Sequence, residues 1–346
     1  MLSFGAMLDP AADVTFYSRF AEERGFAYLY VLDSPIVWRE MSPYLTLSVL
    51  NTTKAKIGAC VTNPVTRNIT VTASLFAALQ ELSEGRMILG LGKGDSAVRR
   101  LGERPVRLKE FKEKALLMHR LANGEEVTYT PRVPAQEKWH AQGTGEITLK
   151  LGWAPRKTLP LYMAAYGPKI LRFAGEVADG VFLQIAEPST IEWAIGHIRT
   201  GAESKGRDLR DIDIVCCTAT AVSDDIHAAC NTVRGFPAVV ANHVLDMLNY
   251  YQPSELPANL LRGIDVKKTY DYRDHARSSA EHSTSVSDET AESFTIIGPP
   301  EKCAEKLQLL QKLGVTQVCL YFLGMSRQGI ESTIKVYADK IMPKVT

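Results

Sequence analysis

The sequence predicts an α/β protein with the (β/α)8 architecture, a TIM barrel. Short β-rich runs alternate with longer amphipathic stretches along the 346 residues, as they do where βα units build a parallel sheet. The alternation yields eight strands, which favours a closed barrel over an open doubly wound sheet. A single domain covering residues 1–346 fits this length, because such barrels often exceed about 250 residues.

The individual elements follow from the pattern in chain order. The expected strands are residues 3–7, 28–32, 56–62, 87–92, 159–164, 181–185, 212–221 and 317–323. The first expected helix, residues 11–24, has Phe16 and Phe20 on one face and ends at Gly25. Further helices are expected at residues 43–51, 71–82, 106–121, 170–178, 189–205, 225–250, 300–313 and 328–341. A break is expected near Pro237, because proline interrupts a helix interior.

Two irregular insertions interrupt the alternation, one after strand four and one before strand eight. Residues 123–158 are polar and rich in Gly, Pro and Thr, and they suggest a hairpin of 125–130 with 146–151. Residues 251–293 are charged and carry most of the late aromatic and histidine residues. Long loops near a barrel mouth are often functional, so the second insertion is expected to be a lid and specificity element. For any single histidine of this insertion, a solvent-exposed surface position agrees with the sequence nearly as well as a place in the site.

Composition excludes several classes of function. The chain has 40 basic and 39 acidic residues and a net charge of +1, which argues against nucleic-acid or membrane-surface binding. No run of eighteen apolar residues and no signal-like start are present, so a cytoplasmic protein is expected. The six cysteines form neither a C-x-x-C pair nor a zinc-like cluster. We therefore expect no metal, and we expect most cysteines to be buried packing residues.

In a TIM barrel the chemistry lies at the C-terminal ends of the strands, on the βα loops. The run LGLGKGDSAVR at 89–99 fails as a dinucleotide fingerprint, because the third glycine would fall at Asp95. It is not a Walker loop either. What remains is a glycine-opened loop with Asp95 at its rim, or a simple turn.

The turn Tyr166-Gly167-Pro168 leads from strand five into a helix. Proline suits a first helical position, and the free amides there form a natural phosphate cradle to which Lys169 adds charge. A plain helix start fits these residues equally well. Within GACVTNPVTR at 58–67, Cys60 has no nearby histidine to activate it and reads as an interior strand residue.

Four segments together resemble the bacterial-luciferase-like family of flavin-dependent oxidoreductases. They are CVTNPVTR, ELSEGRMILGLGKGDSAVRRLG, AAYGPKILRFAGEVADG and FTIIGPPEKCAEKLQLLQKLGVTQVCLYF. The resemblance is nearest to the branch of methylenetetrahydromethanopterin reductase and other coenzyme F420 enzymes. It runs in order from residue 1 to about residue 325, with the two insertions least covered.

The resemblance implies a site. The flavin would lie across the C-terminal mouth, and a non-prolyl cis peptide at Cys60–Val61 would form a bulge against its ring. Acidic residues that line the pocket would be Asp33 and Asp95, the catalytic candidates. The residues expected to bind the cofactor are Cys60, Val61, Thr62, Asn63, Gly94, Ser96, Ala165, Tyr166, Gly167, Pro168 and Lys169. Those expected to contact substrate are Trp38, His243, Tyr272 and His275.

Three functions are compatible with these residues. The first is a two-component monooxygenase that uses oxygen and reduced FMN, supplied by a separate flavin reductase, on a small organic substrate. The second is a coenzyme F420-dependent reductase or dehydrogenase that transfers hydride. The third is a non-catalytic flavin-binding barrel. In either enzyme Asp33 or Asp95 would orient the substrate or, provided that burial raises its pKa, transfer a proton. The structural alternative is that it caps the following helix. A homo-oligomer is expected.

Overall fold

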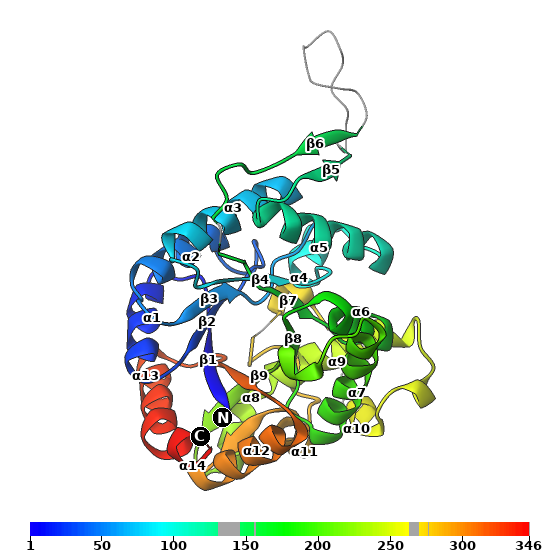
Figure 1. Ribbon diagram of the computed structural model, residues 1–346. Coiled ribbons are helices and arrows are strands. Elements are labelled where there is room, and N and C mark those ends of the chain that lie inside the picture. Colours follow the sequence, from blue (N-terminus) through cyan, green and yellow to red (C-terminus); the bar gives the residue numbers. More distant parts are fainter. Residues whose placement is uncertain (131–145, 156, 263–269, 276, 346) are drawn as a thin grey trace.

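The computed structural model describes residues 1–130, 146–155, 157–262, 270–275 and 277–345, and it is a closed barrel of parallel strands (Figure 1). The ring closes because β9 pairs with both β8 and β11, while β1 pairs with β11 and β2. The barrel strands are β1 Ser3–Leu8, β2 Tyr28–Val31, β3 Lys56–Ala59, β4 Met87–Leu91, β7 Leu161–Ala164, β8 Gly180–Leu183, β9 Asp213–Val222 and β11 Gln317–Tyr321. The predicted fold class and all eight strands are therefore confirmed.

Helices surround this ring, as Figure 1 shows. The main ones are α1 Val14–Glu23, α2 Met41–Leu50, α3 Ile69–Leu82, α5 Leu108–Ala122, α6 Pro168–Val177, α7 Pro188–Ser204, α12 Pro300–Leu313 and α13 Arg327–Val336. Helices α6 and α7 approach closely where Gly201 faces α6, since a Cβ there would lie 1.9 Å from the carbonyl oxygen of Arg172. The chain ends with a π-helical turn, Tyr337–Ile341, and α14, Met342–Val345.

The expected helix over 225–250 is two helices, α8 Ile226–Val233 and α9 Gly235–Leu248. The break falls at Arg234, and Pro237 lies in the first turn of α9. Proline is tolerated there because the amides of a first helical turn have no partner within the helix. The predicted break is confirmed, three residues earlier than the proline.

Both insertions are present. The first contains the predicted hairpin, β5 Val127–Tyr129 paired with β6 Ile147–Leu149, which stands out from the barrel in Figure 1. The second contains α10 Ala258–Leu261, α11 Asp288–Phe294 and short 3₁₀ turns at Pro253–Glu255, Tyr272–Asp274 and Glu281–Ser283. Two further elements were not predicted: α4 Ser96–Arg99, and β10 Ile296–Gly298, which pairs with the C-terminal end of β9. A 3₁₀ turn, Leu209–Asp211, precedes β9.

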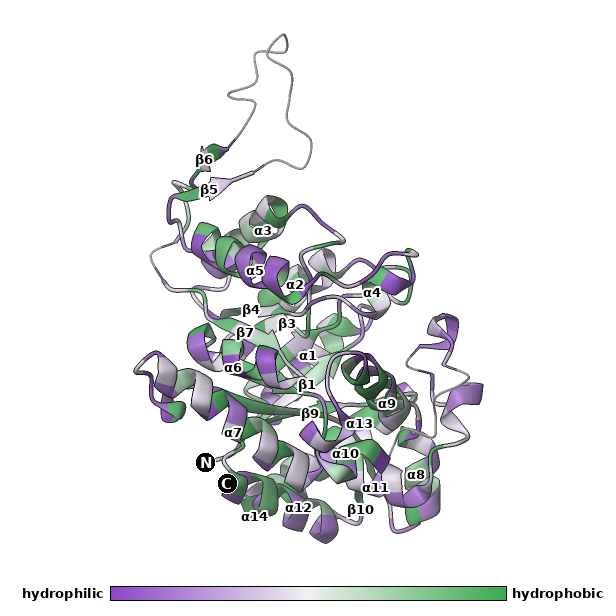
Figure 2. Cartoon of the chain, turned by 90° about the vertical axis from the view of Figure 1, so that its right-hand side faces the viewer, coloured by the Kyte–Doolittle hydropathy of each residue, from purple (hydrophilic) through white to green (hydrophobic). Residues whose placement is uncertain are grey.

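Apolar side chains fill the interior, and the hydrophilic residues lie toward the outside of the helices (Figure 2). The largest fully buried side chain among the described residues, Tyr30 on β2, exchanges hydrogen bonds with Gln317 on β11, one strand away. All six cysteines are free thiols, and all but the half-buried Cys60 are buried, which confirms the expectation for packing residues. Among the described residues, no helix is long and apolar enough to cross a bilayer.

Candidate active site

The end of β3 carries an irregular backbone. The peptide bond between Cys60 and Val61 is cis, as the resemblance implied. The expected strand over 56–62 therefore ends at Ala59, and pairing with β4 resumes only at Thr62. The amide of Thr62 donates to the carbonyl of Gly90 at 3.0 Å, and the amide of Gly92 donates to the carbonyl of Thr62 at 2.8 Å.

The glycines of LGLG allow this approach. A Cβ at Gly90 would lie 1.8 Å from the carbonyl oxygen of Ala59, and one at Gly92 would lie 2.7 Å from a methyl of Val61. Gly94 has φ +89°, a conformation that L side chains rarely adopt. The glycine run therefore serves the contact between β3 and β4, and it is not a phosphate loop.

Cys60 lies beside Cys217, with the two sulfurs 3.9 Å apart. The contact with Cys217 and burial raise the pKa of the Cys60 thiol well above its ordinary value. A thiol of raised pKa is a poor nucleophile, so Cys60 acts here as a packing residue, as expected.

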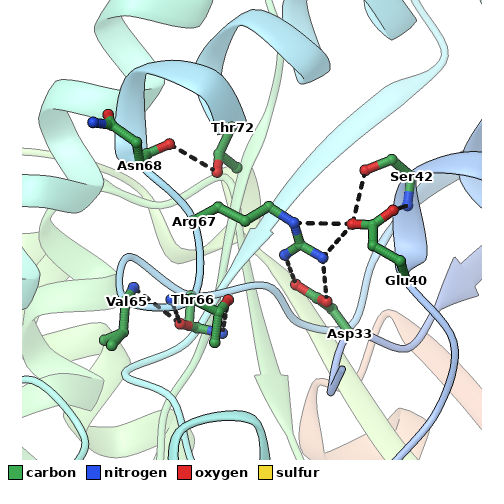
Figure 3. A network of polar contacts seen from close by, with 9 residues as sticks. Asp33, Glu40, Ser42, Val65, Thr66, Arg67, Asn68 and Thr72 are labelled. Atoms are coloured by element: carbon green, nitrogen blue, oxygen red, sulfur yellow. Dashed lines mark hydrogen bonds and ion pairs between the residues drawn. The ribbon is translucent and has the colours of Figure 1, made fainter. Parts of the chain in front are cut away.

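Asp33, at the end of β2, is held by Arg67 in a bidentate ion pair of 2.6 and 2.9 Å (Figure 3). The Asp33 side chain is fully buried, and Arg67 also bonds Glu40, the N-cap of α2. Burial lowers the pKa of the guanidinium, but Asp33 and Glu40 outweigh this effect and raise it. Arg67 thus joins the loops after β2 and β3, and Asp33 caps no helix.

Asp95, after β4, has a different environment. It accepts a hydrogen bond of 2.6 Å from the Tyr272 hydroxyl and one of 3.1 Å from Arg99. His243 on α9 lies 3.8 Å from its second oxygen, which is buried without a hydrogen-bond partner. The side chain does not cap α4.

The net effect on Asp95 is a pKa below its ordinary value. Burial raises the pKa, but the charges of His243 and His275, Tyr272 and Arg99 together outweigh burial. His275 contributes little at pH 7, because burial lowers its own pKa to about 4 and leaves it neutral. The condition set for proton transfer, a pKa raised by burial, is thus not met at Asp95. The cationic and hydroxyl partners that the fold supplies could not be seen from the loop sequence.

The predicted substrate residues do come together. The ring centroids of Trp38 and His275 are 6.2 Å apart, and those of the stacked His275 and Tyr272 are 5.9 Å apart. The ring of His243 packs against that of Tyr166, with a centroid distance of 4.6 Å. Tyr272 also accepts a hydrogen bond of 2.6 Å from Asn242. The second insertion therefore lies against the loops after β2 and β4 and against α9.

The loops that carry the two acids also touch, through Ser34 and Ser96, whose hydroxyls are 2.9 Å apart. The Asn63 side-chain oxygen accepts hydrogen bonds from the backbone amides of Val65 and Thr66 at 3.0 Å each. This side chain therefore stabilises the loop in which it lies. The hydroxyl of Thr62 is buried without a partner.

The start of α6 has the predicted form, with Gly167 as N-cap and Pro168 as the first helical residue. Ala165 is buried beneath it, and the Tyr166 hydroxyl bonds Gln184. Tyr251 lies on the predicted phosphate site at the start of α6. Its hydroxyl accepts a hydrogen bond of 3.3 Å from the Lys169 amide, and a Cβ at Gly167 would be 2.8 Å from its ring. Sequence reasoning did not find this contact, because nothing in the loop spacing brings Tyr251 to α6.

A cavity of about 400 Å³ lies at the same mouth. Its walls come from the loops after β1, β2 and β11, the end of α4 and the second insertion. Its lining residues are Asp9, Ile36, Val37, Trp38, Arg100, Arg273, His275, Arg277, Ser278, Ser279, Tyr321, Leu323 and Gly324.

Asp9 is the acid of this cavity, and sequence reasoning missed it. Burial raises its pKa to about 6, although a hydrogen bond of 3.2 Å from Tyr321 lowers it. Asp9 nevertheless remains exposed to solvent, and it lines the cavity. The rule that identified Asp33, an acid just past a strand end, applies equally to Asp9 past β1. No cluster of metal-ligand residues occurs among the described residues.

Residues 4–317 match the luciferase-like monooxygenase family. The chain belongs to this family. The family and its named reductase relatives make it an oxidoreductase, and the resemblance seen in the sequence is confirmed.

Among related proteins of this family, the chain is 31% identical to the 5,10-methylenetetrahydromethanopterin reductase of Methanolobus tindarius over 90% of each chain. It is 31% identical to the enzyme of that name from Archaeoglobus fulgidus over 96% of each. An F420-dependent glucose-6-phosphate dehydrogenase of Nakamurella multipartita is 23% identical over 94% of this chain and 90% of the relative.

Solved structures of the family have the same fold. The coenzyme F420-dependent tetrahydromethanopterin reductase from Methanopyrus kandleri is 26% identical, with a TM-score of 0.72 over 100% of this chain and 99% of that one. An FMN-bound type II Baeyer-Villiger monooxygenase from Pseudomonas putida has a TM-score of 0.68 over 100% and 99% of the two chains. Its 13% identity shows a common barrel only.

Proposed function

We propose that this protein is an F420-dependent oxidoreductase that transfers hydride between the deazaflavin and a small organic substrate. One observation carries the proposal: reductases and dehydrogenases whose names include F420 or methylenetetrahydromethanopterin match nearly the whole chain. The hydride-transfer alternative of the sequence analysis is thus favoured over oxygenation. The enzymatic relatives also favour catalysis over a non-catalytic barrel.

The residues present fit such a cofactor. Two buried polar atoms, Thr62 Oγ1 and Asp95 Oδ2, lack partners within the described chain. An unsatisfied buried polar atom costs free energy, so a bound group that supplies partners is favoured.

In the mechanism that follows, bound F420 supplies hydride chemistry. The α6 start would hold its phosphate through backbone amides, with Lys169 adding charge and Tyr251 shifting its hydroxyl to the anion. Trp38 and His275 would wall the substrate side, since both line the cavity. Asp33 would not reach the substrate, because its side chain is fully buried in the ion pair with Arg67 and does not line the cavity. Asp95 would position Tyr272 and stay ionised.

Binding tests the proposal directly. Titration of the purified protein with F420, followed by quenching of deazaflavin fluorescence, is expected to saturate in the micromolar range, and FMN is expected not to bind. Lys169→Glu should weaken F420 binding about tenfold, as expected for about 1.4 kcal/mol of lost anion stabilisation. Lys205→Glu makes the same charge change at the exposed end of α7 and should leave the affinity unchanged.

The opposite outcome would restore oxygenation. Saturable binding of reduced FMN without F420 binding would favour the two-component monooxygenase, which would need a separate flavin reductase as partner. The FMN-bound structural relative supports that function only through its fold.

We also propose one domain spanning residues 1–346, since the barrel closes between β1 and β11. A homo-oligomer is supported by exposed apolar residues on neighbouring helices, Leu50 on α2 with Val71 and Leu82 on α3. Light scattering should show more than one chain per particle. A cytoplasmic location is supported by six free thiols, which suit a reducing compartment.

A further inference from the structure

We propose that Asp9 is the group that exchanges a proton with the substrate during hydride transfer, with Tyr321 as its positioning residue. This inference rests on the proposed function. Asp9 lies just past β1, faces the cavity, and is the only carboxylate among its described lining residues. The cavity also holds Trp38 and His275, which link it to the loop after β2 and to the second insertion.

The two acids predicted from the sequence are unsuited to the task. Asp33 is fully buried beneath the Arg67 guanidinium, and neither residue lines the cavity. Asp95 does not line the cavity either, and the charges of its histidine neighbours, Tyr272 and Arg99 hold its pKa below the ordinary value and favour the carboxylate. A proton donor must be protonated part of the time and must reach the reacting atom.

Asp9 meets both conditions. No ion pair joins it to any residue of the described chain, and its one side-chain hydrogen bond comes from Tyr321 at 3.2 Å. That bond engages one carboxyl oxygen and leaves the other without a hydrogen-bond partner among the described residues. Tyr321 is itself buried on β11, where burial raises its pKa well above the ordinary value and keeps it a hydroxyl donor.

The other charged groups around Asp9 do not neutralise it. From the second insertion, Arg273 pairs with Asp271 and Arg277 pairs with Asp274. His275 is neutral at pH 7, since burial lowers its pKa to about 4. Arg39, in the loop after β2, donates at 3.4 Å to the backbone of Pro10 instead.

Arg100, at the end of α4, is the remaining cation of the cavity. Its Nε is buried without a hydrogen-bond partner, and its charge acts on Asp271. Burial therefore dominates at Asp9 and raises its pKa to about 6. A carboxyl of that pKa is present in both protonation states near neutral pH.

The step balances as follows. In reduction, a substrate carbonyl carbon gains hydride, which carries two electrons, from reduced F420, and the C=O π bond becomes an O–H bond with the proton of Asp9. The cofactor is oxidised, the substrate is reduced, and Asp9 is left as a carboxylate that regains a proton from water in the cavity. In oxidation of an alcohol, the same carboxylate accepts the hydroxyl proton while the carbon loses hydride.

The protonation state can be measured without substrate. In protein labelled with ¹³C at aspartate carboxyls, one resonance should titrate near pH 6, and Asp9→Asn should remove it. Asp13→Asn, which deletes a carboxylate four residues away at the start of α1, should leave it in place. A wild-type spectrum in which no carboxyl titrates between pH 5 and 7 would overturn the proposal.

Turnover gives the second readout, with reduced F420 and short aldehydes, ketones and alcohols as probes. Asp9→Asn should lower kcat at least about 100-fold while F420 affinity stays within twofold, and Asp9→Glu should recover part of the rate. Tyr321→Phe removes the bond that lowers the pKa of Asp9, so it should move the pH profile upward. Full activity of Asp9→Asn would refute the role. If neither wild type nor any variant binds F420, the proposed cofactor is refuted. The ¹³C titration would still show independently whether Asp9 changes its protonation state near pH 6.

Discussion

Asp33 and Asp95 stand at equivalent places, one just past β2 and one just past β4, yet the structure gives them different tasks. Asp33 is enclosed with Arg67 and Glu40 in a network drawn from two neighbouring loops. Asp95 receives its partners from remote segments, Tyr272 of the second insertion and His243 of α9. The position at a strand end thus identifies candidate active-site acids. The residues that bond each acid determine its role: Asp33 joins two loops, and Asp95 joins the barrel to the second insertion.

The largest expected effect is on the Asp33 side of this comparison. Arg67→Ala would leave Asp33 buried without its cation, which costs about 3–5 kcal/mol of unfolding free energy. Urea denaturation followed by circular dichroism measures this loss. Arg210→Ala, which breaks the exposed pair with Asp208, is the matched control and should leave the midpoint unchanged. If Arg67→Ala costs less than about 1 kcal/mol, the two acids are not as different as the contacts indicate.

The Asp95 side should respond locally. Tyr272→Phe removes a hydrogen bond to a carboxylate, for which about 1.5–3 kcal/mol is expected. Amide exchange should speed up in residues 270–275 and around Asp95, while the barrel strands keep their protection. Tyr250→Phe, at an exposed position near the same insertion, serves as the control. Unchanged exchange in 270–275 would show that other contacts hold the insertion in place.

The smallest effect separates Asp95 from Asp9 by the sign of a pH dependence. The pKa of Asp95 is lowered by folding, so its stabilisation is present above the ordinary value of 3.8 and lost as pH falls through the folded value. The pKa of Asp9 is raised to about 6, so its stabilisation is complete below 3.8 and lost as pH rises through 6. The difference in melting temperature between wild type and Asp9→Asn should therefore decrease as the pH rises from 4 to 7. The difference in melting temperature between wild type and Asp95→Asn should instead decrease as the pH falls below 4. Parallel curves for the two variants would contradict both assignments.

The barrel could be predicted because its signals are local. Strand runs, amphipathic helices and the Gly167-Pro168 helix start each depend on neighbours in sequence, and the structure places them close to the expected bounds. The cis bond at Cys60–Val61 followed only from the family resemblance, since no residue pattern marks it. The short strand β10 was missed because three residues are too few for a periodicity signal.

The site was harder to predict, because charge and burial depend on residues far apart in the chain. Arg67 neutralises Asp33 across 34 positions, and Tyr272 bonds Asp95 across 177. Loop sequences could supply acids but not their partners, so the direction in which the pKa of Asp95 is shifted could not be predicted. Asp9 carried the same signal as Asp33, and the barrel rule would have found it had the loop after the first strand been included.

The second insertion both walls the cavity, through Arg273 to Ser279 where described, and holds Asp95, through Tyr272. A substitution there that reshapes the substrate compartment will therefore also alter the electrostatic field at the end of β4. Through the second insertion, selectivity and site charge therefore cannot be varied independently. An engineer who wants a new substrate without a new pH profile would do better to change Ile36 and Val37, which line the cavity from the loop after β2.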